Sequence, residues 1–289
     1  MGRIRIATDS TADLPAALVK EYDIAVIPLK IIFGEEAYRE NIDITTQEFY
    51  EKLAKAEKLP ATSQPSPGEF QEFYEELTKD GSAVISIHIS SLMSGTCQSA
   101  NIAKAALADK DITVVDSRQV SAALGMVVIT AAKAAKAGKG KEEILKIVQT
   151  MMEHVRAYFV VDTLENLEKG GRIGKATAFL GGMLNIKPVL TINDGLIGPF
   201  EKIRGKGKAL ERLVEVAKEY AAVHGNVRCI IAHADVLEEA IKVHERISSE
   251  VQCTEIILGE VGAVVGTHAG AGTVAVFFYE AELEDRLLS

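Results

Sequence analysis

The sequence predicts an α/β protein, with a parallel-sheet α/β domain in its first half and an α+β domain in its second half. In the first half, short β-rich runs alternate with helical patterns, which is typical of a parallel sheet covered by helices. After residue 155 the pattern changes, and Asp194-Gly195 between two apolar runs predicts a hairpin. The chain has 289 residues, more than one hydrophobic core usually organises, so we expect domains at 1–155 and 156–289.

In the first half, three β-rich runs are each followed by a helical pattern. Between the first and second of these units, residues 24–59 read as an insertion that decorates the sheet. It has extended segments around Phe33-Gly34-Glu35 and a helix from Thr46. The expected strand and helix pairs are 3–8 with 14–21, 83–90 with 96–107, and 112–116 with 120–137.

In the second half, a helix at 141–156 leads into strands and helices in a less regular order. A Gly-rich segment runs from Gly170 to Gly182. The expected strands are 158–162, 188–192, 196–203, 227–232, 254–259 and 273–279, and the expected helices are 208–223 and 237–249.

Composition narrows the possible functions. The formal net charge of −9 argues against nonspecific attraction to nucleic acid or anionic lipid. Three cysteines without a CxxC pair indicate neither a disulfide framework nor a zinc site. The longest apolar stretch, 122–135, is too short to span a bilayer, and no signal sequence is visible. We therefore expect a cytoplasmic protein without stable membrane insertion, nucleic-acid partner, metal or cofactor.

Polar residues at the carboxyl ends of the predicted parallel strands are candidates for a ligand site, because loops there lead into helix N-termini. These residues are Thr8-Asp9-Ser10, Ser90 to Thr96, and Asp116-Ser117. Ser66-Pro67-Gly68-Glu69 instead reads as a capping box and favours a structural role for Ser66. Ser94-Gly95-Thr96 fits a helix cap and an anion-binding turn about equally well.

His268 differs from the other five histidines because it lies in a segment of small residues, 266–272, where a ligand or backbone can approach closely. Paired with Ser94, it would suggest a serine esterase or acyl-transfer enzyme. The sequence before Ser94 lacks the glycine expected two residues before an elbow nucleophile, which weakens that alternative. No HExxH or Walker A motif is present, and the glycines do not form a dinucleotide fingerprint.

Basic residues gather in two glycine-containing segments, 169–175 with Arg172 and 202–208 with Arg204. In an acidic protein, arginines flanked by glycines suggest contact with phosphate or with an acidic protein partner. Ordinary surface solubility explains the same pattern about equally well.

Motifs along nearly the whole chain resemble the DegV family, whose better-understood members are the fatty-acid-binding subunits of bacterial fatty acid kinase. One departure is visible, because Gly270-Ala271-Gly272 stands where the family commonly has Gly-Pro-Gly. The matching residues are Thr8-Asp9-Ser10, Asp13-Leu14-Pro15, Thr62 to Ser66, Ser94-Gly95-Thr96, Gln98-Ser99-Ala100, Asp116-Ser117, Gly170 to Ile173, Lys187-Pro188, Arg204 and His268.

The resemblance implies a protein that is not itself an enzyme. It implies a long-chain fatty acid such as palmitate between the two domains, with its carboxylate held by Thr62, Ser94 and His268. Support from Ser63, Gly95, Thr96 and Gly270 is expected. The family presents the acid to a separate kinase, and we expect Arg172 and Arg204 to dock that partner. A lipid transport or sensor protein without a kinase is an alternative.

Overall fold

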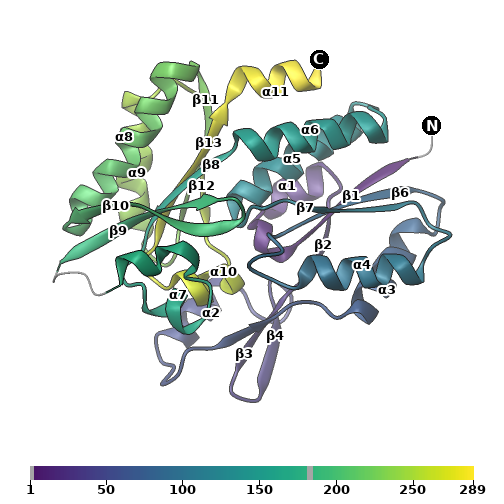
Figure 1. Ribbon diagram of the computed structural model, residues 1–289, viewed down its shortest axis with the longest axis horizontal. Coiled ribbons are helices and arrows are strands. Elements are labelled where there is room, and N and C mark those ends of the chain that lie inside the picture. The colour runs from purple at the N-terminus through teal and green to yellow at the C-terminus, as the bar shows by residue number, and fades with distance from the viewer. Residues whose placement is uncertain (1–2, 181–184) are drawn as a thin grey trace.

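The computed structural model describes residues 3–180 and 185–289, which form two large β-sheets and one small one. Figure 1 shows the parallel sheet of the first half on the right and the sheet of the second half on the left. The small sheet lies below them. The α/β prediction is confirmed.

The first sheet has the strand order β2-β1-β6-β7, and all of its neighbouring strands are parallel. A capping box at Ser66 starts one of its covering helices, as the sequence predicts. The strands are β1 (Ile4–Asp9), β2 (Ala25–Ile27), β6 (Ala83–His88) and β7 (Ile112–Asp116), and the helices are α1 (Ala16–Glu21), α3 (Pro67–Thr78), α4 (Thr96–Ala106), α5 (Ala122–Lys136) and α6 (Lys141–His154).

The segment expected as an insertion does more than decorate this sheet. Its first strand, β2, is an edge strand of the parallel sheet itself. Its hairpin of β3 (Lys30–Phe33) and β4 (Glu36–Arg39) joins β5 (Ala61–Ser63) in a three-stranded antiparallel sheet. Together with α2 (Thr46–Leu53), this small sheet packs against helix α10 (Ala263–Ala269), which belongs to the second half of the chain.

The second sheet has the order β10-β9-β8-β13-β11-β12 and is antiparallel except between β11 and β12. Asp194 and Gly195, with φ of 52° and 80°, form the expected hairpin turn. Gly182 lies outside the described residues. The strands are β8 (Arg156–Val160), β9 (Ile186–Asn193), β10 (Leu196–Arg204), β11 (Val227–His233), β12 (Cys253–Glu260) and β13 (Val274–Glu280), and the helices are α7 (Glu165–Lys169), α8 (Lys206–His224), α9 (Leu237–Glu250), α10 and α11 (Ala281–Leu288).

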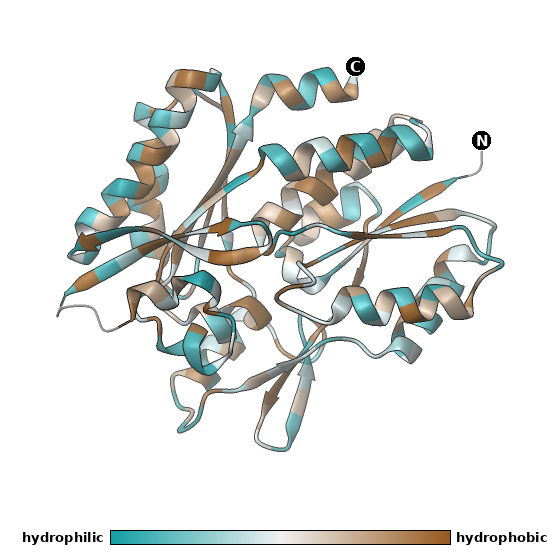
Figure 2. Cartoon of the chain, viewed as in Figure 1, coloured by the Kyte–Doolittle hydropathy of each residue, from teal (hydrophilic) through white to brown (hydrophobic). Residues whose placement is uncertain are grey.

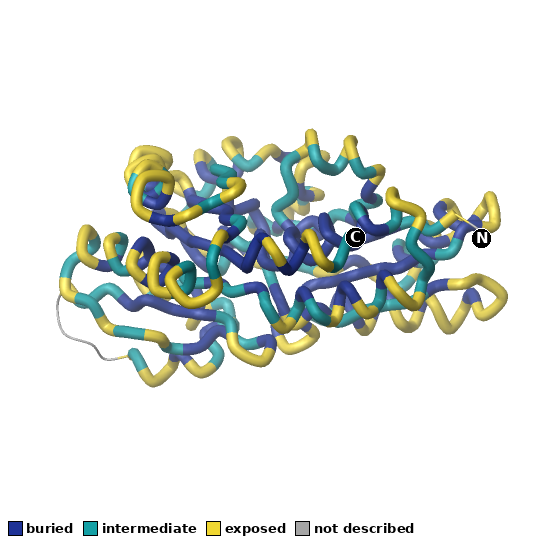
Figure 3. Tube along the Cα trace, turned by 90° about the horizontal axis from the view of Figure 1, so that it is seen from above, coloured by how far each residue is buried: buried dark blue, intermediate teal, exposed yellow. Residues whose placement is uncertain are grey.

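Strand β13 shows how the second sheet contributes to two cores. Its side chains alternate between faces: Ala275 and Phe277 join the core between the two large sheets, whereas Val276 and Phe278 join a core under α8 and α9. Both faces are apolar, and brown strands accordingly run through the centre of Figure 2. Figure 3 shows the same strands buried and the outer helix faces exposed.

Helix α5 fills the space between the two large sheets and is buried along most of its length. Gly125 permits its close approach to the turn after β1, because a Cβ at this position would lie 2.7 Å from the Ala12 carbonyl oxygen. The core around α5 includes side chains from both halves of the chain. The division into domains at residue 155 therefore stays a prediction. In the described part of the chain, no helix is long and apolar enough to cross a membrane.

Candidate functional site

A cavity lies where the carboxyl ends of the parallel strands face the second sheet and α10. It holds about 860 Å³ of space free of protein atoms, with the open solvent at its mouth included. Most of its wall is apolar. Apolar side chains come from several elements around the cavity: Ile89 after β6, Phe159 on β8, Phe277 on β13 and Val264 on α10.

Thr62 and His268, which are 206 positions apart in the sequence, meet in this wall. Thr62 Oγ1 lies 2.8 Å from His268 Nε2. Burial, together with the nearby positive charge of Arg172, lowers the pKa of His268 to about 4. The imidazole is therefore neutral at neutral pH in the ligand-free protein.

Ser94 is the third residue predicted to hold the carboxylate of the fatty acid, and it lines the same cavity. Its Oγ lies 2.8 Å from Thr96 Oγ1 and accepts a hydrogen bond from the Thr96 N–H at 3.3 Å. Thr96 is fully buried, so it supports Ser94 and does not line the cavity itself. Gly95 permits the close approach of Gln64, because a Cβ at position 95 would lie 2.6 Å from the side-chain amide nitrogen of Gln64. Gln64 also lines the cavity.

Arg172, predicted to dock a partner, lies in the cavity wall near His268. Its guanidinium donates to the carbonyl oxygens of Met93 at 3.1 Å and Gly170 at 2.6 Å. It thus joins the loop that carries Ser94 to the segment that packs against His268. Arg172 therefore contributes a positive charge to this site. Its role in docking a partner stays a prediction.

Three other predicted residues lie outside the cavity wall. Ser63 directs its hydroxyl to the Gln64 carbonyl oxygen at 3.2 Å. Gly270 supports the site through its backbone, because its φ of +82° ends α10 and a Cβ there would meet Asn166. Gly272 also has a positive φ, of +88°, so Ala271 stands between two positions that require glycine. Arg204 is exposed at the end of β10, apart from the wall residues.

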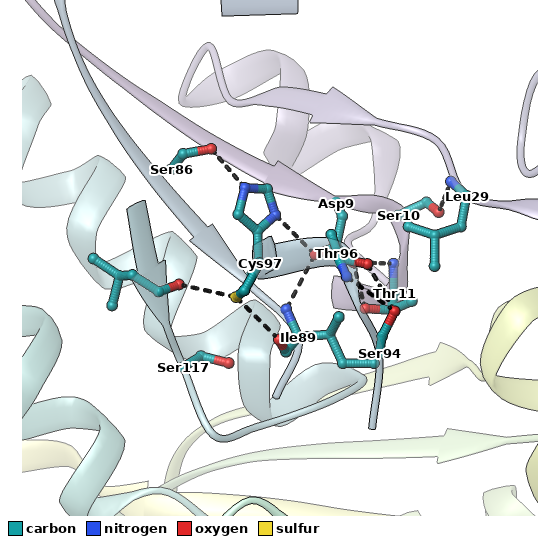
Figure 4. A network of polar contacts seen from close by, with 12 residues as sticks. Asp9, Ser10, Thr11, Leu29, Ser86, Ile89, Ser94, Thr96, Cys97 and Ser117 are labelled. Carbon is teal, nitrogen blue, oxygen red and sulfur yellow. Dashed lines mark hydrogen bonds and ion pairs between the residues drawn. The ribbon is translucent and has the colours of Figure 1, made fainter. Parts of the chain in front are cut away.

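The polar residues at the strand ends, which were candidates for a ligand site, mostly bond to one another. Asp9, fully buried, accepts from Thr11, from the Ile89 N–H at 3.0 Å and from His88 Nδ1 at 2.9 Å. Figure 4 shows this network beside Ser94 and Thr96. Because His88 also pairs with Ser86 at 2.7 Å, the group resembles a Ser-His-Asp triad. It is sealed from solvent, so it serves to fix Thr11 and Ile89 in the cavity wall.

The esterase alternative receives little support from the geometry. His268 lies in helix α10, a short element that was not predicted from the sequence. Its Nε2 is paired with Thr62, and among the described residues its buried Nδ1 has no hydrogen-bond partner. A serine nucleophile requires a base hydrogen-bonded to it and oriented by a third group. Ser94 and His268 are not arranged in that way.

Two contributors to the site were not identified from the sequence. Gln64 lies within the matched motif at 62–66, so its proximity to Thr62 was an available signal. Gly170 leaves room for His268, since a Cβ at Gly170 would collide with the imidazole Nδ1. The matched motif at 170–173 contains this glycine, but the sequence does not reveal that the imidazole packs against it.

Comparison with known proteins gives matches along almost the whole chain. The family model described as "Uncharacterised protein, DegV family" matches residues 3–281. Protein DegV of Bacillus subtilis is 41% identical over 274 residues, covering 94% of this chain and 98% of that protein. A DegV domain-containing protein of Caldanaerobacter subterraneus is 38% identical over 280 residues, covering 97% of this chain and 100% of that protein.

Solved structures of such proteins have the same fold. A DegV family protein from Thermus thermophilus, described by its fatty acid binding, superposes with a TM-score of 0.91 at 34% identity, covering 96% of this chain and 99% of that one. DegV from Bacillus subtilis, described as a fatty acid binding protein, gives 0.87 at 40% identity, with 97% and 100% covered. A stearic acid-binding protein from Eubacterium ventriosum gives 0.89 at 27% identity, with 98% and 99% covered. This chain belongs to the DegV family.

Proposed function

We propose that this protein binds a long-chain fatty acid in the cavity and is not itself an enzyme. The observation that carries the proposal is the distribution of hydrogen-bond donors in an otherwise apolar wall. Thr11 donates its hydroxyl hydrogen to Asp9, Ser121 to Asp13, and Thr273 to carbonyl oxygens at the end of α10 and of its C-cap residue. Donors for a carboxylate therefore concentrate where Thr62, Ser94, His268, Arg172 and Gln64 meet.

This distribution suits an ionised head group with a long apolar tail. A buried carboxylate must be hydrogen-bonded, and the hydroxyls of Thr62 and Ser94 can donate to it while the imidazole of His268 supplies a further polar contact. Burial of the tail contributes about 0.8 kcal/mol per methylene, or roughly 10 kcal/mol for about sixteen carbons before ordering costs. The tail therefore dominates affinity, and the polar residues orient the acid.

The related proteins support this assignment, since the homologues from Thermus thermophilus and Bacillus subtilis are described as binding fatty acids. We further propose that the bound acid is presented to a separate fatty acid kinase, which forms the acyl phosphate. Arg204 is suited to docking that kinase, because it is exposed and its planar guanidinium matches phosphate and carboxylate groups. Arg172 lines the cavity, so any contact that it makes with the kinase would be made from the cavity wall.

Mass spectrometry of the denatured protein tests the binding proposal. Protein produced in bacteria should carry about one fatty acid per chain, because a buried tail is released slowly into water. Protein stripped of lipid should take up added palmitate. If it carries no lipid and takes up neither palmitate nor oleate, the proposal is wrong. Turnover of an activated acyl ester with an acyl-Ser94 intermediate would support the esterase instead.

Arg204→Ala tests presentation separately from binding. We expect its fatty acid content to match that of the unmodified protein, while acyl-phosphate formation with a cognate kinase falls sharply at low salt. The difference should shrink at high salt, because salt screens the same contact in the unmodified protein. Lys208→Ala, an exposed change in the same basic segment, is the matched control. Lost lipid in Arg204→Ala, or kinase coupling equal to that of the control, would contradict the docking role.

A further inference from the structure

Two carboxylates, Asp13 and Glu40, meet behind the ligand cavity at the start of α10. Glu40 is only 1% exposed, and its Oε1 accepts a hydrogen bond from the Val264 N–H at 2.7 Å. Asp13 Oδ2 accepts from the Ser121 hydroxyl at 2.6 Å. A Cβ on Gly262 would lie 2.5 Å from Asp13 Oδ1 and 2.8 Å from Glu40 Oε1, so both carboxylates face the same point.

This pair has no compensating cation among the described residues. Asp13 Oδ1 and Glu40 Oε2 are buried without a hydrogen-bond partner, and neither carboxylate forms an ion pair. The titratable groups near the pair are acidic or neutral. Asp9 at the end of β1 acts on both carboxylates, and Tyr50 on α2 lies near both. Glu260 at the end of β12 lines the hollow beside Asp13, and Asp235 acts on Tyr50. Exposed Lys20 only borders the adjacent hollow.

The surroundings favour retention of a proton by the pair. Burial raises the pKa of Glu40 to about 7, and burial together with the charge of Glu40 raises the pKa of Asp13 well above its usual value. With one proton between them, the pair carries a single negative charge, which the N–H groups of α10 stabilise. Loss of that proton leaves two negative charges at one buried point.

The pair is connected to the ligand site through α10. Val264 lies at the first turn of this short helix and His268 lies one turn later, so both move with the same rigid element. The small sheet and the residue that follows β4 contact α10 at both ends, through Glu40 to Val264 and through Thr62 to His268. Tyr50 adds a hydrogen bond to the Val261 carbonyl oxygen at 2.9 Å.

We propose that Glu40 is a positioning residue for the ligand site: it holds α10 so that His268 meets Thr62, and full ionisation of the Asp13–Glu40 pair loosens this hold and weakens ligand binding. The inference rests on the proposed function, because its effect is read through fatty acid affinity. Val264 also lines the cavity, so movement of α10 alters the apolar wall as well as the head-group contacts.

The test measures palmitate affinity by displacement of an anthroyloxy-labelled stearate from lipid-free protein between about pH 6 and about pH 9. For the unmodified protein we expect affinity to fall at least tenfold, because ionisation that opposes binding costs up to about tenfold per pH unit. Glu40→Gln should bind at every pH as the unmodified protein does near pH 6. Its amide can still accept from the Val264 N–H and can donate to Asp13.

Other variants separate positioning from general effects. Glu40→Ala removes the contact to α10 and should weaken binding about tenfold or more at every pH. Glu35→Gln, which removes an exposed charge in the turn of the same hairpin, should keep the pH profile of the unmodified protein. The NMR signal of the His268 ring should shift with pH near pH 7 in the Glu35→Gln control and not in Glu40→Gln.

The two proposals can fail separately. Absence of palmitate binding near pH 6 would overturn the proposed function. Palmitate binding that is independent of pH would overturn the positioning role of Glu40. A pH dependence that persists in Glu40→Gln would also overturn it and would assign the titration to His268 and the ligand.

Discussion

Replacing Thr62 with valine tests the head-group assignment with little structural disturbance. Thr62→Val exchanges a hydroxyl for a methyl group of similar size, so the pairing of Thr62 with Ile31 between β5 and β3 should persist. In the proposed complex, the Thr62 hydroxyl donates to the carboxylate while its oxygen stays near His268 Nε2, 2.8 Å away in the free protein. The substitution removes both interactions.

The expected size of the effect follows from the two states. A hydrogen bond to a charged group contributes about 1.5 to 3 kcal/mol, so palmitate affinity should fall roughly 10- to 150-fold. The free protein loses a bond between neutral groups, because the lowered pKa of His268 leaves its ring uncharged. We therefore expect only about 1 kcal/mol of lost stability. The substitution should weaken binding more than folding.

The assay is a palmitate titration of lipid-free protein, accompanied by a urea unfolding curve. Ser63→Ala is the matched control, because it removes a neighbouring hydroxyl that bonds to the Gln64 carbonyl oxygen and lies outside the cavity wall. Palmitate affinity in Thr62→Val equal to that of the unmodified protein would refute the reasoning. An equal loss in Ser63→Ala would show that the effect is not specific to the cavity.

Three further predictions follow from the cavity. Ala275→Phe should fill space needed by the acyl tail and reduce the bound fatty acid measured by mass spectrometry; an unchanged lipid content would place the tail elsewhere. Gly170→Ala should displace His268 and weaken palmitate binding by about 1 to 3 kcal/mol in titrations, unlike Gly207→Ala, whose surroundings are open. Burial depresses the pKa of His268 from 6.5 to about 4, so its neutral ring contributes up to roughly 3 kcal/mol to the free energy of unfolding above pH 6.5. This contribution is lost as pH falls toward 4. His268→Gln should lack this part of the pH dependence in urea unfolding, and identical profiles would contradict the assignment.

Many elements could be predicted from the sequence because local periodicity determines them. Apolar runs near Ile6 and Ile85 are long enough for buried strands, and Asp194-Gly195 can adopt the positive φ angles that a tight hairpin requires. The short helix that carries His268 was missed because glycine, alanine and threonine give little helical signal. Strand β2 was missed because three residues show no clear period.

The site was only partly predictable. The resemblance indicated Thr62, Ser94 and His268, and the structure places all three in one cavity wall. It did not indicate that Arg172 would lie beside His268, because basic residues near glycines fit a surface loop and a cavity edge equally well. The roles of Thr96 and Gly270 as supports became apparent only from their contacts.

By itself, the sequence determined the α/β class and the order of most strands and helices, because these depend on residue type and on spacing within a few turns. The candidate head-group residues followed from the family resemblance and stay a prediction. Only the tertiary structure decided that Thr62 meets His268 across 206 positions and that Glu40 accepts a hydrogen bond from the helix carrying that histidine. Such contacts depend on how separate sheets pack. The lowered pKa of His268 and the raised pKa of Glu40 were decided in the same way, since burial and neighbouring charges exist only after distant segments come together.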